Sequence, residues 1–164
     1  MVLAGSEMWL PSTLARDWRG YVAGGGHVLS LGIDSLRRGV TVSTQRAFLP
    51  THPRAKDVFG ARVGPVTRTH GTLILAGRDG LGIFAGTSGA MRGYGWLQSF
   101  KSLSPPESIA SEAGVSAAAP AIVGYRLARG TVVDIGLPGF AATVAHDFDG
   151  RQLLDRIWHH VLAR

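Results

Sequence analysis

The first 35 residues contain a short apolar run, an amphipathic stretch and a second apolar run, with only short connections between them. We expect a strand at Met1–Ala4 and a second strand at His27–Leu31. A helix between them begins near Pro11, with Leu14, Trp18, Tyr21 and Val22 on one face, and ends at Gly24-Gly25-Gly26. Two strands joined by one helix are the unit of a parallel sheet, so this segment predicts an α/β domain.

The middle of the chain gives weaker signals. We expect strands at Val40–Thr44 and Thr72–Ala76. Prolines and the lack of a period predict a loop from Phe48 to Pro65, and composition predicts a surface loop over Ser104–Ala119. The glycines between Gly77 and Gly95 are interpreted as turns, because no Lys follows a Gly there as a phosphate-binding loop requires.

The last 45 residues have clearer patterns. Two strands, Ala121–Leu127 and Thr131–Gly136, flank a short turn and predict a hairpin. Apolar residues from Leu153 onward predict an amphipathic terminal helix, for which Asp149 and Gln152 form a capping box. Trp18 and Trp158 lie on the apolar helical faces, so both are expected in the core.

Composition limits the possible classes. The chain has 164 residues, 45% hydrophobic and 17% charged, which fits one folded domain and excludes intrinsic disorder. It has no cysteine, which excludes disulfides and thiolate nucleophiles. No apolar run reaches the length of a membrane helix, and the start of the chain lacks the features of a signal peptide. We therefore expect a cytoplasmic protein without a membrane partner.

The net charge of +6 is concentrated between Arg37 and Arg78, where eight basic residues accompany only Asp57. Such a stretch would neutralise phosphates in a nucleic-acid binder. The basic residues are scattered, however, and few aromatic side chains accompany them. We therefore favour a solvated surface or a face that meets an acidic partner, and keep a basic nucleic-acid-associated module as the third hypothesis.

Two segments together resemble a known family. The first is Val2-Leu3-Ala4-Gly5-Ser6-Glu7-Met8-Trp9 with the helix, Gly24-Gly25-Gly26 and the strand that ends in Leu31-Gly32-Ile33-Asp34. The second is the hairpin with the loop Gly136-Leu137-Pro138-Gly139-Phe140 and the terminal helix. They resemble the C-terminal domain of the large (beta) subunit of N,N-dimethylformamidase over roughly residues 1–45 and 120–164.

The resemblance implies a class I glutamine amidotransferase-like fold. This is an α/β, three-layer fold with a mainly parallel sheet flanked by helices, here with the terminal hairpin and C-terminal helix. It also implies a single domain over residues 1–164 that is the C-terminal fragment of a longer protein. Asp34 occupies the position of the amidotransferase nucleophile, and without cysteine a Cys-dependent amidotransferase is excluded.

The dimethylformamidase family holds iron with two tyrosines and one glutamate, and the metal activates water to attack a small amide. Glu7 matches the glutamate and Asp34 the asparagine of the family motifs, so the resemblance implies catalytic roles for Glu7 and Asp34 and a metal-ligand role for Glu7. The family's His is replaced near Ser6, and Met8 stands where the family has Tyr. The tyrosine ligands would come from an upstream domain of the same polypeptide.

Alternatives remain for each residue. Glu7 could cap the next helix or pair with an arginine, and Asp34 could form an Asx turn. Without a Gly-x-Ser-x-Gly motif, Ser6 and Ser35 do not predict a serine hydrolase. His159 and His160 are adjacent, so they point in different directions from a helix.

The leading hypothesis is a domain that scaffolds or completes a metal-dependent small-amide hydrolase site and is inactive alone. The alternative is a non-catalytic oligomerisation or assembly domain, whose partner is the upstream domain or a second copy. Both depend on one geometric prediction: the first two strands are parallel neighbours whose carboxyl ends bring Glu7 and Asp34 to the same edge.

Overall fold

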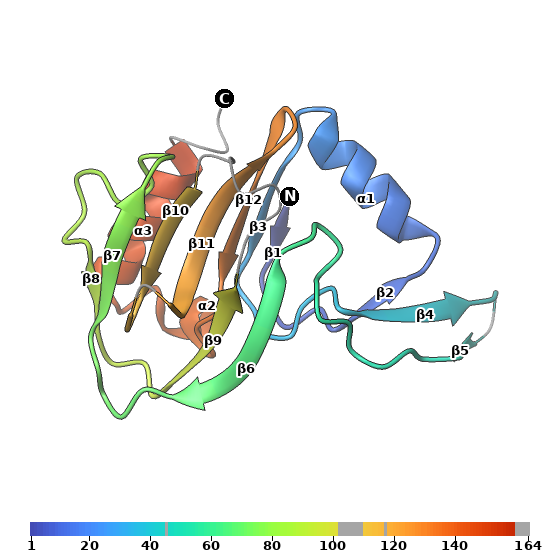
Figure 1. Cartoon of the computed structure of the whole chain (residues 1–164), viewed down its shortest axis with the longest axis horizontal. Helices are drawn as coiled ribbons and strands as arrows, with labels where there is room; N and C mark the ends of the chain where they lie inside the picture. Colours follow the sequence, from blue (N-terminus) through green and yellow to red (C-terminus); the bar gives the residue numbers. More distant parts are fainter. Residues whose placement is uncertain (45, 102–109, 117, 160–164) are drawn as a thin grey trace.

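The structure is a computed structural model that describes residues 1–44, 46–101, 110–116 and 118–159. Its centre is a seven-stranded sheet in the order β1-β3-β12-β11-β10-β7-β8, and two smaller sheets, β2-β4-β5 and β6-β9, accompany it (Figure 1). The strands are β1 (Val2–Leu3), β2 (Trp9–Pro11), β3 (His27–Ser30), β4 (Arg38–Val42), β5 (Ala47–Phe48), β6 (Arg62–Arg68), β7 (Ile74–Asp79), β8 (Ala90–Met91), β9 (Trp96–Lys101), β10 (Ala110–Gly114), β11 (Pro120–Leu127) and β12 (Gly130–Ile135). The helices are α1 (Leu14–Ala23), α2 (Phe140–Thr143) and α3 (Phe148–Ile157).

The predicted mainly parallel, three-layer sheet is wrong. Only the β1–β3 and β3–β12 pairs of the large sheet are parallel, whereas β12–β11, β11–β10, β10–β7 and β7–β8 are antiparallel. The physical reason is that parallel neighbours need a long crossover, and α1 supplies one between β1 and β3. From β7 onward, most neighbouring strands are joined without a helix and therefore run in opposite directions.

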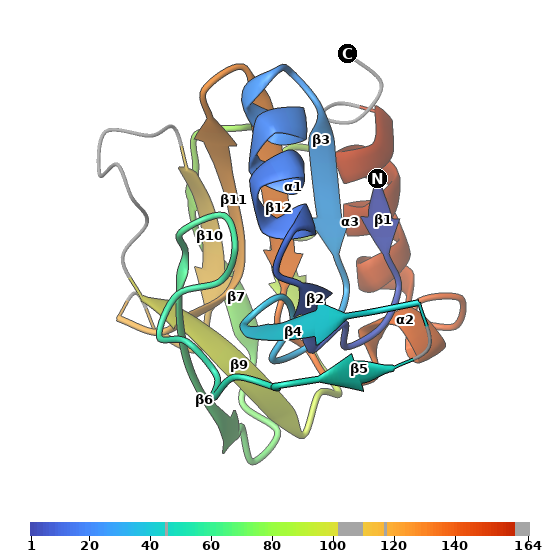
Figure 2. The same ribbon diagram turned by 90° about the vertical axis from the view of Figure 1, so that its right-hand side faces the viewer.

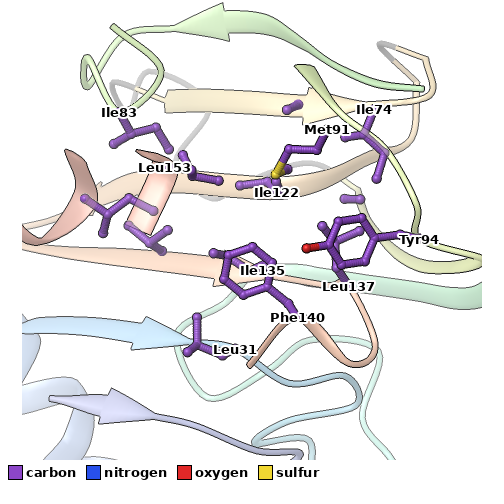
Figure 3. Close-up of a cluster of buried hydrophobic side chains, with 14 of the residues drawn as sticks. Leu31, Ile74, Ile83, Met91, Tyr94, Ile122, Ile135, Leu137, Phe140 and Leu153 are labelled. Carbon is purple, nitrogen blue, oxygen red and sulfur yellow. The ribbon is translucent and has the colours of Figure 1, made fainter. Parts of the chain in front are cut away.

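Two hydrophobic clusters fill the two faces of the large sheet, because side chains alternate along each strand. Val133 and Ile135 of β12 face α2 and α3, where Phe140, Leu153 and Ile157 are buried. Figure 3 shows part of this cluster, in which Ile135, Leu137, Phe140 and Tyr94 lie next to one another. The second cluster includes Val22 of α1, Phe59 and Phe100, and packs on Val132 and Tyr125 at the opposite face. α1 and α3 therefore cover opposite faces (Figure 2).

Several predicted elements are confirmed with shifted bounds. The first strand, the first helix, the second strand, the hairpin and the terminal helix are all present. β4 and β7 overlap the strands predicted at residues 40–44 and 72–76. The predicted continuation of this helix over 160–164, including His160, lies outside the described residues.

Other predictions are wrong. The predicted loop over residues 48–65 contains the start of β6. The predicted surface loop over 104–119 is described at 110–116 and 118–119, and the first of these ranges contains β10, which occupies an inner position of the large sheet. The rest of that loop, 102–109 and 117, lies outside the described residues. Asp149 does not cap α3: the N-cap is Asp147, and Asp149 accepts a hydrogen bond from the Ser88 hydroxyl at 2.8 Å. Trp158 is 50% exposed instead of buried.

The corner between α2 and α3 is fixed by Tyr94. Its ring stacks on Phe140 with centroids 6.1 Å apart, and its hydroxyl donates to Asp147 Oδ2 at 2.6 Å. Burial, together with the Asp147 carboxylate, raises the pKa of Tyr94 above its ordinary value. The tyrosine therefore remains a hydrogen-bond donor across the physiological range and orients the start of α3.

Candidate functional site at the rim of β1 and β3

The geometric prediction about the opening strands is confirmed. β1 and β3 are parallel neighbours, with Val2 opposite Leu29 and Leu3 opposite Ser30. The loops that follow them therefore leave the same edge of the sheet, which is where open α/β sheets bind ligands. Glu7 lies in the first of these loops and Asp34 in the second.

Backbone contacts join the two loops closely. The Ile33 N–H donates to Ser6 Oγ at 3.2 Å, and the Leu36 N–H donates to the Glu7 carbonyl at 2.8 Å. Gly32 lies against Gly5, because a β-carbon added at Gly32 would be 2.1 Å from the Gly5 carbonyl oxygen. A side chain at position 32 is therefore excluded, and the loops form one packed unit.

Asp34 is held by two arginines. Arg37 donates to Oδ1 at 2.6 Å and Arg38 donates to Oδ2 at 3.1 Å. Its backbone N–H donates to Gln98 Oε1 at 2.6 Å, and its φ of 52° lies in the left-handed region that Asp tolerates better than most residues. Both carboxylate oxygens are thus engaged in holding the turn after β3. This arrangement differs from the Asx turn that was the alternative for Asp34, because the donors to the carboxylate are two arginine side chains. The catalytic role of Asp34 stays a prediction.

Glu7 is exposed, and within the described residues no hydrogen bond or ion pair of its carboxylate is found. No group of three or more His, Cys, Asp and Glu side chains in the described part of the chain is arranged to hold a metal ion. An iron site needs several ligands, so one glutamate does not constitute one. The residues present therefore do not fit an iron centre by themselves, and the metal-ligand role of Glu7 stays a prediction.

Gln98 of β9 is a residue that the sequence analysis missed. Its side chain is buried, and its Oε1 accepts from the Asp34 backbone N–H. Its Nε2 donates to the Gly64 carbonyl at 3.2 Å, and its backbone N–H donates to the Gly136 carbonyl at 2.7 Å. It thereby joins the loop after β3 to β6 and to the end of β12. No sequence motif marks it, and only its polar character in an apolar strand distinguishes it.

A second group of polar residues lies beneath the α1 side of the sheet, and the sequence analysis also missed it. Asp134 of β12 is opposite Ser30 of β3, and both are buried with Tyr125. Asp134 Oδ2, Ser30 Oγ and the Tyr125 hydroxyl have no hydrogen-bond partner among the described residues. Asp57 lies near them in the loop before β6, where its Oδ1 accepts from the N–H groups of residues 59, 60 and 61 at 2.7–2.9 Å.

Burial determines the protonation of this group. It raises the pKa of Asp57 to about 6, although the three backbone N–H groups and Arg19 act in the opposite direction. Burial, reinforced by the charge of Asp57, raises the pKa of Asp134 well above its usual range. Burial and the two nearby carboxylates raise the pKa of Tyr125. The group is therefore poor at carrying negative charge.

Three arginines of the basic segment make contacts within the molecule. Arg37 and Arg38 bind Asp34, and Arg38 also lies 5.3 Å from the Trp9 ring centroid. Arg68 lies 4.9 Å from the Trp96 ring centroid. The expectation that nucleic acid is not the partner stays a prediction.

Two serines of the rim loops are engaged in holding those loops. Ser6 Oγ accepts from the Ile33 N–H of the neighbouring loop, and the Ser35 hydroxyl donates to the Ile33 carbonyl at 3.4 Å. His159 pairs with Asp155 at 3.2 Å on α3, where both side chains are exposed. Burial is the main cause of the lowered pKa of His27, and the charges of Arg126 and the N-terminus add to it. No helix in the described part of the chain is long and apolar enough to cross a membrane.

Comparisons with known proteins give structural neighbours only. No family model matches the chain, and no curated protein matches it. The solved structure of a β-galactosidase from Bacillus circulans sp. alkalophilus matches 90% of this chain with a TM-score of 0.55 and 14% identity. A β-galactosidase from the haloarchaeon Halorubrum lacusprofundi matches 93% of the chain with a TM-score of 0.49 and 20% identity.

In both cases the chain spans 22% of the enzyme's length. At such identity the likeness to the Bacillus structure describes the fold alone. It agrees with a strand-rich mixed domain and not with the predicted mainly parallel sheet.

Proposed function

We propose that this chain is a non-catalytic assembly domain that associates with a second copy of itself. The observation that carries the proposal is the state of Asp34, whose two carboxylate oxygens are occupied by Arg37 and Arg38. The chemistry implied by the family resemblance needs carboxylates that face a substrate, whereas the Asp34 carboxylate stabilises a turn.

The surface also supports this proposal. An open groove of about 610 Å³ lies between α3 and the β1 edge of the large sheet and is lined by Val2, Leu29, Leu31, Leu154 and Trp158, among others. Most of its lining is apolar, and an exposed apolar groove of this kind marks an interaction surface more often than a polar catalytic cleft.

The experiment is sedimentation velocity of the chain from micromolar to sub-millimolar concentration, with a parallel assay for hydrolysis of small amides in the presence of ferrous iron. We expect a concentration-dependent oligomer and no turnover. A chain that is monomeric throughout the range would contradict the proposal. Turnover by the chain that disappears in Glu7→Gln would also contradict it.

A second candidate is that Glu7 completes a metal-dependent small-amide hydrolase site of the dimethylformamidase type, with other ligands from an upstream domain. The specific observation in its favour is that Glu7 is exposed at the rim where the carboxyl ends of β1 and β3 meet. The test compares amidase turnover of the polypeptide as the cell produces it with that of Glu7→Gln and of Asp17→Asn, an exposed carboxylate on α1. Only Glu7→Gln should lose turnover, and equal turnover by all three would remove Glu7 from the mechanism. The cytoplasmic location stays a prediction.

A further inference from the structure

The outer face of α3 has an unusual pattern. Phe148, Arg151, Asp155 and Trp158 are all exposed and recur at intervals of three, four and three residues. Residues at these intervals form one stripe along a helix, as the a and d positions of a coiled coil do. The two aromatic ends of the stripe, Phe148 and Trp158, are 63% and 50% exposed, so both offer apolar area to a partner.

The stripe is complementary to itself when it is inverted. In an antiparallel helix pair centred at position 153, residue 151 of one helix is opposite residue 155 of the other, and residue 148 is opposite residue 158. Arg151 of each copy therefore faces Asp155 of the other, and Phe148 of each faces Trp158 of the other. A two-fold axis requires this kind of self-complementary patch.

The charges also select one orientation. A parallel pair would place Arg151 against Arg151 and Asp155 against Asp155, and like charges in contact oppose association. The antiparallel pair instead makes two opposite-charge contacts between two aromatic pairs, over about 15 Å of helix. The stripe therefore specifies both the partner and the direction in which it binds.

The groove next to α3 continues this surface. Arg151, Asp155 and Trp158 belong to both the stripe and the groove, whose floor is formed by Leu29 and Leu31 of the sheet. In the antiparallel pair, Phe148 of the second copy lies beside Trp158, at the place where the groove begins. The aromatic ring of the second copy thus has an apolar surface to cover.

From this geometry we propose that α3 is a homodimer interface, in which two copies of the chain pack their α3 helices antiparallel about a two-fold axis. The proposal rests on the assembly function proposed above and names its surface and partner. A contact limited to one helix and part of a groove is small, so the dimer is a weak, reversible one.

The test is a charge exchange in the full chain, measured by sedimentation velocity. Arg151→Asp and Asp155→Arg each replace the opposite-charge contacts with like-charge contacts, and we expect each to weaken the dimer by about 30-fold or more. The double variant carrying Arg151→Asp together with Asp155→Arg restores opposite charges across the axis and should return dimerisation to near the parent value. Phe148→Ala should weaken the dimer without affecting the charge contacts.

Controls separate folding from association. Arg129→Asp makes the same charge change on the exposed β11–β12 turn and should leave the dimer unchanged. Circular dichroism of each variant verifies that α3 is folded, which is expected because the altered side chains are exposed. Because His159 pairs with Asp155, the single and double charge variants are also measured in a His159→Gln background. The double variant should restore dimerisation there to the same extent.

The outcomes distinguish the two proposals. Oligomers that form but do not respond to the single variants, or are not rescued by the exchange, would overturn the α3 interface and leave the assembly function standing. A chain that is monomeric at every concentration would overturn both. Loss in each single variant with recovery in the double variant would establish the interface.

Discussion

Acidification from pH 7 to pH 5 should stabilise this protein through Asp57, and Asp57→Asn should remove that gain. The pKa of Asp57 is raised by burial from 3.8 to about 6, so the folded state binds a proton more readily than the unfolded state. A raised carboxyl pKa contributes stability that is fully present below 3.8 and is lost as the pH rises through about 6.

The magnitude follows from those two values. At pH 7 the carboxyl is ionised in both states, whereas at pH 5 it is mainly protonated in the fold and mainly ionised in the unfolded chain. Integrating the proton difference gives about 1.3 kcal/mol more stability at pH 5 than at pH 7. Asp134 acts in the same direction, because its pKa is also raised by burial.

His27 acts in the opposite direction. Its pKa is lowered in the fold, so the unfolded chain binds more protons and stability is lost as the pH falls through the lowered value. The informative quantity is therefore a difference between variants. The free energy of unfolding in urea at 25 °C is measured at pH 5 and pH 7 for the parent and for Asp57→Asn, and His27 contributes equally to both.

We expect the change between pH 7 and pH 5 to be about 1.3 kcal/mol less stabilising in Asp57→Asn than in the parent. Asn keeps an oxygen that accepts from the three backbone N–H groups, so the loop is preserved. Asp17→Asn, the same change on the exposed face of α1, is the matched control and should behave as the parent. Identical pH responses in parent and Asp57→Asn would refute the reasoning, because the carboxyl would then titrate alike in both states.

Four further substitutions test the packing. Gly32→Ala should destabilise the fold by about 3 kcal/mol, because its β-carbon would overlap the Gly5 carbonyl. Gly20→Ala in α1 is the matched control: its β-carbon meets no atom within 4 Å, so it should stabilise the fold by about 1 kcal/mol. Equal urea midpoints for the two variants would contradict this prediction. Tyr125→Phe removes a buried hydroxyl that has no hydrogen-bond partner in the described structure. It should leave the free energy of unfolding unchanged or raise it by up to about 1 kcal/mol. A marked fall in the midpoint of thermal unfolding would instead reveal a hydrogen bond of this hydroxyl. Gln98→Leu leaves the Asp34 N–H and the Gly64 carbonyl without their hydrogen-bond partner. It should lower the free energy of unfolding, measured by chemical denaturation, by about 2–4 kcal/mol. An unchanged free energy would show that solvent replaces the amide.

The helices, strands and turns that the sequence predicts correctly depend on residues close together in the chain. The first strand, helix and second strand follow from apolar periodicity and the glycine turn, and the hairpin at 120–135 follows from two apolar runs around a short turn. The parallel pairing of β1 and β3 also followed, because a short crossover helix permits little else. Thus the same-edge placement of the loops that carry Glu7 and Asp34 was predictable from residue order.

The direction of the remaining strands was not predictable, because it depends on contacts between distant segments. The sequence predicts a surface loop where β10 lies, because Ala, Ser, Glu and Gly have low strand propensity. In the structure, hydrogen bonds to β7 on one edge and to β11 on the other hold this segment as a strand. Trp158 was placed in the core by its helical period, but the sheet next to that part of α3 offers a groove instead of a covering layer.

Sequence alone determined the local elements, the absence of thiol chemistry and the edge at which Glu7 and Asp34 are placed. Only the tertiary structure decided that Gln98 joins three segments and that Asp57 is buried near Asp134. The physical reason is that turns, helices and the pairing of Asp34 with Arg37 and Arg38 depend on neighbours within a few residues, whereas burial and the contacts of Gln98 depend on segments that folding brings together from distant positions.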